Sequence, residues 1–258
     1  MAMTLDIRKI VDSWPYEPGE LSVRKVGGDD GREKVQMRLD LGLLQMEMTG
    51  RPDGQRPHGA ESLLHHHLAS LDSYRKRNGT DLGFELTAEQ CQALRAEAVM
   101  YYHRYLSLFV LEEYEHVERD TARNLQALDL LAKYAAKRED RVNFQHYRPY
   151  LIMMNTRAKA HTALKAKAYR SALAHVDAGL SAIAEFWHAL DEEEDGVDAT
   201  EVMILQALRQ EILEQLPTDP IAKLERALEA AVDEERYEDA ARLRDQIRQQ
   251  RRQAGEPK

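Results

Sequence analysis

The side chains best suited to chemistry gather between residues 51 and 67. Arg51, Arg56 and His58 stand among glycines and prolines that favour turns. Such a loop could receive an anion such as a phosphate on its arginine and histidine side chains. A solvated connection between two elements explains the same composition. The sequence leaves both interpretations open.

The histidines that follow this loop could hold a metal ion only in part. His65, His66 and His67 are consecutive, and neighbouring residues on a helix point about 100° apart, so the three cannot all ligate one ion. His58 or Glu61 with His65 could make a partial site. A hydrolase built there would require a bound metal ion. We expect instead a polar helix face, with no metal and no cofactor.

Nothing in the chain arranges a nucleophile for catalysis. Cys91, the one cysteine, lies in a plain helical pattern, and no glycine elbow accompanies any serine. No Ser-His-Asp or Cys-His arrangement can be argued. We therefore expect no catalytic residue and no enzymatic activity.

The C-terminal stretch 221–247 has the clearest pattern in the chain. A helix can start at Asp219-Pro220, where a carboxylate caps free N–H groups and proline fits the first helical position. Apolar residues recur at three- and four-residue spacing and resume after the charged residues 234–236, which predicts two helices folded back on each other. Tyr237 is expected to fill the tip of this hairpin. The residues expected to bind a partner are Leu224, Leu228, Val232, Tyr237, Ala240, Leu243 and Ile247.

This hairpin resembles the UVR motif of the excision-repair proteins UvrB and UvrC. The residues that carry the resemblance are Leu224, Leu228, Ala231, the block 235–241 and Leu243-Arg244-Asp245. The resemblance implies pairing with another UVR motif, as in UvrB with UvrC, or with a second copy of the chain. A generic amphipathic hairpin is the alternative. The chain has no phosphate-binding loop and no recognisable nuclease module.

Two short helices bury too little apolar surface to be stable alone. The hairpin is therefore expected to need a partner, on this chain or another. Single UVR motifs also occur in regulatory adaptors of bacterial protease and stress systems, and the whole chain is similar to uncharacterised bacterial UVR-motif proteins.

Arginines gather on the last predicted helix, where Arg244, Arg248 and Arg251 have only Asp245 to offset them nearby. They could contact a phosphate or an acidic partner. Solubility and helix capping, with a favourable interaction with the helix dipole, explain them better.

Composition limits the class of protein. The chain has 258 residues, of which 43% are hydrophobic and 31% are charged, as expected of a mainly helical globular protein. A formal net charge of −9 argues against tight non-specific DNA binding. The single cysteine fits a reducing cytoplasm. The N-terminus lacks the pattern of a signal peptide, and no apolar run of about eighteen residues predicts a membrane span.

The first fifty residues are the part with strand-like alternation. Residues 21–26 and 34–41 alternate apolar with polar around a glycine-rich turn at 27–31, which predicts a β-hairpin. Residues 44–48 could add a third strand before the loop at 50–57.

Residues 87–216 read as successive helices, with breaks near 138–143 and 191–196. Within them 160–180 resembles one tetratricopeptide unit, with Ala160, Ala172 and Gly179 at small positions and Tyr169 at the turn between helices. A weaker echo around Tyr114 lies 55 residues earlier, so the pattern is not a regular tandem array. An ordinary helical bundle is the alternative.

Tyrosines cluster at 101–105 and 144–150. Beside arginine and histidine they could stack on bases or line a peptide groove, but half-buried core positions explain them better.

The sequence thus predicts a mainly α fold of antiparallel, tetratricopeptide-like helical hairpins with a small N-terminal β-hairpin or three-stranded sheet and a C-terminal UVR hairpin. The expected domains are 1–58, 59–216 and 217–258. We expect a cytoplasmic adaptor protein whose hairpin pairs with UvrB, UvrC, another UVR protein or itself. The alternative is a DNA-repair accessory that contacts UvrB or UvrC and also DNA.

Overall fold

The structure is a computed structural model that describes residues 6–190, 199–216, 220–233 and 236–253. The chain forms two compact units, Met1–Ile212 and Leu213–Lys258. The elements are α1 (Arg8–Asp12), β1 (Val23–Gly27), β2 (Glu33–Leu39), β3 (Gly42–Glu47), η1 (Pro57–Gly59), α2 (Leu63–Asn78), α3 (Ala88–Val110), α4 (Tyr114–Tyr134), α5 (Arg138–Val142), η2 (Gln145–Tyr147), α6 (Arg148–Lys165), α7 (Tyr169–His188), α9 (Thr200–Gln215), α10 (Pro220–Asp233) and α11 (Tyr237–Gln253). The fold is mainly α, as predicted.

The N-terminal strands form a three-stranded antiparallel sheet in the order β1-β2-β3, so the predicted third strand is confirmed. Gly31 takes a φ of 74° in the turn before β2, a conformation that glycine adopts without strain. Val35 and Met37 of β2 and Met46 of β3 are buried in the same core cluster as the helices. The sheet therefore belongs to the same compact unit as the helical body.

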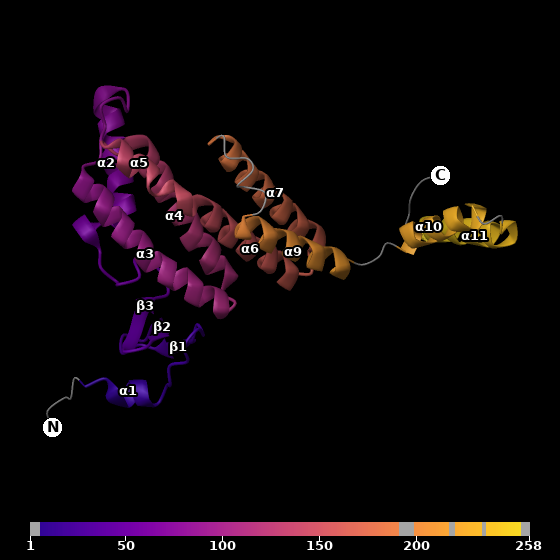
Figure 1. The fold of residues 1–258 in the computed structure, drawn as a ribbon, viewed down its shortest axis with the longest axis horizontal. Helices are drawn as coiled ribbons and strands as arrows, with labels where there is room; N and C mark the ends of the chain where they lie inside the picture. The colour runs from indigo at the N-terminus through magenta and orange to yellow at the C-terminus, as the bar shows by residue number, and fades with distance from the viewer. Residues whose placement is uncertain (1–5, 191–198, 217–219, 234–235, 254–258) are drawn as a thin grey trace. The chain divides into compact units, whose positions relative to one another are not determined.

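Helices α3, α4, α6 and α7 pack on one another in chain order, each against the next (Figure 1). Thr87 and Gln90 form a capping box at the start of α3, and Pro149 occupies the first turn of α6. The predicted break near 138–143 separates α4 from α6 and contains the short helix α5. The other predicted break, 191–196, lies outside the described residues. The antiparallel helical hairpins are therefore confirmed.

The two hairpins of this body turn with the same backbone geometry. Residues 111–113 join α3 to α4, and residues 166–168 join α6 to α7. The central residues Glu112 and Lys167 have positive φ angles of 57° and 56°. In each turn the last residue donates its N–H to a carbonyl five residues earlier, at 2.9 Å and 2.8 Å. Tyr114 and Tyr169 then begin the second helices.

Small residues bring α6 and α7 close together, as the sequence predicts. Ala160 and Ala172 are fully buried. A Cβ at Gly179 would overlap the side chain of Thr156, so only glycine fits there. The close approach is shown by the structure, whereas the resemblance to a tetratricopeptide unit stays a prediction.

Two apolar clusters form the core of the first unit. The larger joins the sheet to α3, α4, α6, α7 and α9, and the smaller lies among α2, the first half of α3 and the second half of α4. Cys91 is completely buried in the smaller cluster. Burial raises the pKa of its thiol, which disfavours the reactive thiolate.

Candidate functional site

The C-terminal hairpin, α10 and α11 together, is closed by small residues. Ala231 on α10 and Ala240 on α11 are buried, and so is Ile247. Leu224, Leu228 and Leu243 are half-buried. Alanines let the two helix backbones approach each other, so the interior of the hairpin is filled without the largest side chains. The structure therefore gathers Leu224, Leu228, Ala240, Leu243 and Ile247 of the predicted stripe at or beside the seam between the helices.

Two predicted partner-binding residues lie outside this interior. Val232, at the end of α10, is 48% exposed, and Tyr237, at the start of α11, is 68% exposed. The expectation that Tyr237 fills the tip of the hairpin is wrong, because the alanines already close the seam and leave the ring in solvent. The turn residues 234–235 between them, and the cap at Asp219, lie outside the described residues.

The arginines of α11 are exposed where the structure describes them. Arg244 contacts the neighbouring Asp245 at 3.1 Å, and Arg248 is exposed. Arg236 pairs with Asp239 at 2.9 Å in the first turn. The side chain of Arg251 lies outside the described residues. A contact between these arginines and an anion stays a prediction.

The loop before α2 does not present Arg51 to solvent. Its side chain is 11% exposed, and its Nε lies 3.1 Å from Glu97 Oε1, with Asp53 at 3.4 Å. Arg56 and His58 are exposed. His58 takes a positive φ of 52° and stacks on His66, with 4.2 Å between ring centroids. Since two carboxylates already neutralise Arg51, an anion at this loop would rely mainly on Arg56 and His58.

The reason for the inward turn of Arg51 is a buried charge cluster, which we define as Glu97, Arg104, Asp120 and Arg123. Arg104 makes a bidentate pair with Asp120, at 2.7 Å and 2.8 Å, and both side chains are at most 1% exposed. Arg104 also donates to the carbonyl oxygens of Glu47 and Gly50, at 2.9 Å and 2.8 Å. It thereby ties the end of the sheet to α3 and α4.

The other half of the buried charge cluster fixes α2. Glu97 accepts hydrogen bonds from the N–H groups of Leu63 and Leu64, at 2.8 Å and 3.3 Å, at the positive end of that helix. Arg123 pairs with the same carboxylate. Tyr101 lies between the two arginines, with guanidinium carbons 4.8 Å and 4.3 Å from its ring. These residues position elements and present no free reactive group.

The histidines of α2 do not assemble a metal centre with their neighbours. His65 Nε2 lies 4.0 Å from Glu61, and His65 Nδ1 lies 2.8 Å from the Ser62 hydroxyl. His67 is buried, and burial lowers its pKa to about 4, with smaller effects of His66 and His58. Within the described residues, no three His, Cys, Asp or Glu side chains could hold a metal ion together.

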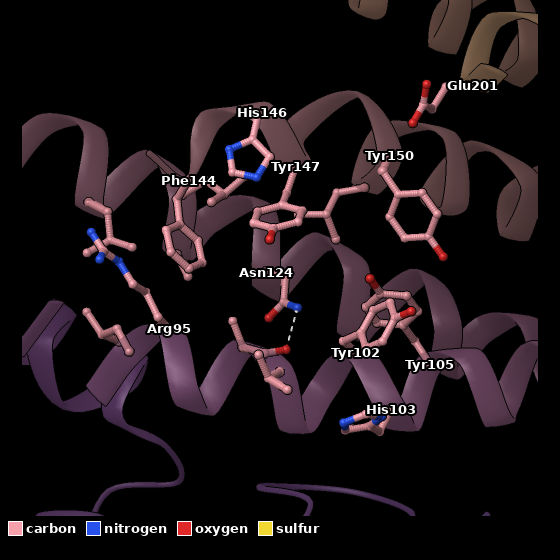
Figure 2. Close-up of a pocket in the computed structure, with 17 residues that line it drawn as sticks. Arg95, Tyr102, His103, Tyr105, Asn124, Phe144, His146, Tyr147, Tyr150 and Glu201 are labelled. Atoms are coloured by element: carbon pink, nitrogen blue, oxygen red, sulfur yellow. Dashed lines mark hydrogen bonds between the residues drawn. The ribbon is translucent and has the colours of Figure 1, made fainter. Parts of the chain in front are cut away.

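The clustered tyrosines divide between core and surface. Tyr101 and Tyr105 are buried, as the core interpretation predicts, but Tyr102 is 38% and Tyr147 is 49% exposed. With Tyr150 they line a groove of about 570 Å³ between α3, α4 and the start of α6, which we call the tyrosine groove (Figure 2). The sequence signals the tyrosines but not the hollow between them.

Comparison with protein families identifies the C-terminal hairpin. The family model described as the UvrB/uvrC motif matches residues 218–253. No curated protein and no solved structure matches the chain. In the part of the chain that the structure describes, every helix is too short or too polar to cross a lipid bilayer. The C-terminal hairpin of this chain is thus a UVR motif, a protein-interaction module.

Proposed function

We propose that this protein is a non-enzymatic adaptor that uses its UVR hairpin to pair with a protein partner or with a second copy of itself. The observation that carries the proposal is the exposure of Val232 and Tyr237, 48% and 68%, on a hairpin that matches the UVR motif. Both side chains flank the one turn of the hairpin. An aliphatic and an aromatic residue at such a tip form an apolar anchor of the kind that dominates interfaces.

The energetics of the hairpin favour pairing. Among its described residues, only Ala231, Ala240 and Ile247 are buried, and Leu224, Leu228 and Leu243 are half-buried, so the hairpin buries limited apolar surface by itself. Fully covering an exposed Val or aromatic side chain contributes ~1.5–3 kcal/mol, and Val232 and Tyr237 would each contribute part of this because they are 48% and 68% exposed. The charges on α11 would form a polar rim, because Arg236 with Asp239 and Arg244 with Asp245 lie at its surface. Rim charges steer partner choice more than they add affinity.

The buried cysteine and the buried charge cluster support an adaptor role over an enzymatic role. The single cysteine is buried. The ionic groups of the buried charge cluster hold the loop at Arg51, the end of the sheet and the start of α2 in place. We also propose a cytoplasmic location, because the chain has a single cysteine, and a bacterial source, because the chain resembles bacterial UVR-motif proteins. The partner would be UvrB, UvrC, another UVR protein or a second copy of this chain.

A repair accessory that also touches DNA is the second candidate. It is favoured by one observation, the exposed Arg244 and Arg248 on the same helix that carries the motif. Steeply salt-dependent binding to DNA by the full chain would support it, because each phosphate contact releases counterions. DNA binding that does not depend on salt concentration, or the absence of DNA binding, would contradict this second candidate.

The test of the adaptor proposal is the mass of the purified full chain in solution, alone and mixed with UvrB or UvrC, by light scattering after size exclusion. We expect a dimer or a mixed complex. The variant Val232→Asp, Tyr237→Asp should abolish it while the circular dichroism stays unchanged. The matched control is Leu82→Asp, since Leu82 is 82% exposed on the body. A complex that survives the double substitution would contradict the proposal. So would a complex that the control Leu82→Asp also abolishes, because the loss would then not be specific to the hairpin.

A further inference from the structure

The tyrosine groove has features that pairing through the UVR hairpin does not use. Its walls come from α3 below and from η2 and α6 above, with α4 behind (Figure 2). Tyr102 meets Tyr105 edge to face at 5.6 Å and lies 6.4 Å from Tyr150. Tyr102 and Tyr147 at the mouth are partly exposed, while Tyr105 is 2% exposed. Its volume lies in the range of small-molecule sites.

The tyrosines that line the groove have no lysine or arginine group over their rings among the described residues, whereas many other aromatic rings of the protein do. Lysine or arginine groups lie over the rings of Trp14, Tyr16, Tyr101, Phe109, Tyr114, Tyr134 and Phe144. No such contact exists at Tyr102, Tyr105, Tyr147 or Tyr150 in the described part of the chain. No internal cation therefore occupies the faces of these rings, and the partly exposed Tyr102 and Tyr147 are accessible to a positive group from outside.

A carboxylate stands beside the same rings. Glu201, in the first turn of α9, lines the groove near Tyr150 (Figure 2). Among the described residues it makes no ion pair and no side-chain hydrogen bond. It also complements the dipole of α9, which explains its place at a helix start. The dipole does not explain why its carboxylate lies near Tyr150 at the edge of the groove.

A cation acts on this end of the groove from outside its lining: Arg157, which lies over Phe109 with 4.3 Å from guanidinium carbon to ring centroid, interacts electrostatically with Tyr150. The titratable groups of the lining itself add no positive charge here. Burial lowers the pKa of His103, so its imidazole is neutral at pH 7. Burial also raises the pKa of Tyr150 to about 12; Tyr102 and Glu201 add smaller effects in the same direction and Arg157 opposes them, so the hydroxyl of Tyr150 keeps its proton. At the far end Arg95 pairs with Asp140 and lies over Phe144, with 4.5 Å from guanidinium carbon to ring centroid. Between the ends the floor is apolar, with Leu94, Leu128 and Leu131.

We propose that the tyrosine groove binds a small organic cation with an apolar body. Its positive head lies against Tyr102, Tyr105 and Tyr150 beside Glu201, and its apolar body extends over Leu128 and Leu131 toward Phe144. The aromatic faces and the carboxylate stabilise the charge in a partly dry site, where an unpaired cation would be costly. The apolar floor excludes a strongly hydrated inorganic ion.

The test uses two probes with the same apolar body, phenethylammonium and phenethyl alcohol, of which only the first is charged; each is titrated into the full chain and followed by amide NMR shifts. We expect the cation to bind about tenfold or more tighter than the alcohol, with shifts confined to the groove. Equal affinity would overturn the proposal, because the groove would then recognise only the apolar body. No binding of the cation would overturn it as well.

Variants locate the cation within the groove. Tyr102→Leu should weaken phenethylammonium about tenfold while Tyr102→Phe keeps it, because the ring face and not the hydroxyl is required. Glu201→Gln should weaken the cation and leave the alcohol unchanged. The control is Glu85→Gln, since Glu85 is exposed outside the groove. Equal losses in the Leu and Phe variants would contradict the proposal. So would a lysine-containing tripeptide that binds where phenethylammonium does not, since the occupant would then be a protein segment.

Discussion

In the helical body and in the UVR hairpin a tyrosine begins the second helix of a hairpin, but the two regions place this tyrosine differently. In the body, Tyr114 stacks on His161 of the next hairpin at 4.9 Å and meets the edge of Phe109 at 5.4 Å. In the UVR hairpin, Arg236 donates to a carbonyl five residues earlier at 2.8 Å, as the last residue of each body turn does. Tyr237 follows it and is 68% exposed.

The two tyrosines differ in what surrounds them: Tyr114 packs between helices of its own unit, whereas Tyr237 is exposed on its hairpin. The tyrosine after the first body turn is the point at which one helical hairpin contacts the next, because His161 belongs to α6. In the proposed adaptor, Tyr237 would make the corresponding contact with the helical hairpin of a partner. The body derives its stability from its own core and its buried charge cluster, whereas the UVR hairpin is expected to gain stability from a partner.

The largest expected effect is on the body alone. Arg104→Ala leaves Asp120 buried with only Arg119 as its partner, at 2.9 Å. It also removes the hydrogen bonds from Arg104 to the carbonyl oxygens of Glu47 and Gly50. We expect the free energy of unfolding of the body to fall by ~3–5 kcal/mol, measured by urea denaturation. The control is Arg32→Ala, because the side chain of Arg32 is 78% exposed. A loss as small as the control's would mean that the cluster does not hold the sheet and helices together.

The next largest effect is expected from acid, which should lower the stability of the body without changing pairing through the hairpin. The pKa of His67 is lowered by burial to about 4 from an ordinary 6.5. Between these values the unfolded chain binds a proton that the folded chain does not, so the stability of the body is complete above pH 6.5 and falls as the pH drops toward 4. At about 1.4 kcal/mol per unit, the loss approaches ~3 kcal/mol. The hairpin residues 220–253 contain no histidine, so pairing should not share this window.

Unfolding midpoints at pH 7 and pH 5 measure the effect of acid. His67→Leu is the variant that should flatten the difference, because it removes the titrating group and keeps the site apolar. The control is His146→Leu, since His146 is exposed. An unchanged pH dependence in His67→Leu would assign the effect to another group, such as His161, whose pKa burial also lowers.

The turn tyrosine of the body should have an intermediate effect. Tyr114→Ala removes the stacking on His161 and the contact with Lys165, whose Nζ lies 4.7 Å from the ring centroid. Tyr114 is half-buried, so we expect a loss of ~2 kcal/mol, below the range for a fully buried aromatic residue. Urea denaturation beside Tyr114→Phe, which should lose far less, checks it. Equal losses would point to the hydroxyl rather than to the ring.

The comparison also shows what the sequence could predict. Period-two alternation in residues 21–48 and the apolar spacing in 221–247 predict the sheet and the UVR hairpin, because burial on one face repeats with the geometry of the element. Glu97 and Arg104 stand in helical register with Tyr101 and Leu108 on the buried side of α3. A charged residue in an apolar stripe signals a buried ion pair, but its partners Asp120 and Arg123 come from another helix, so the pairing needs the tertiary structure.

The same limit applies to the sites. The loop sequence predicts that Arg51 could meet an anion, yet its charge is taken by Glu97, which lies on a distant part of the chain. Spacing predicts Tyr237 on the apolar stripe, but whether a large ring lies inside a hairpin or outside it depends on how closely the two helices approach. The alanines at 231 and 240 decide that distance.

The smallest expected effect on stability falls on the residue with the largest expected effect on pairing. Tyr237→Ala removes a ring that is 68% exposed, so the free energy of unfolding of the dilute monomer should change by less than ~0.5 kcal/mol. The same change should weaken a dimer or mixed complex at least tenfold, since an apolar anchor of ~1.4 kcal/mol or more is lost. Tyr114→Ala should do the reverse, destabilising the body without changing the affinity of the hairpin for its partner. If both variants changed stability alone, the turn tyrosines would be equivalent parts of one fold, and the exposure of Tyr237 would carry no meaning for binding.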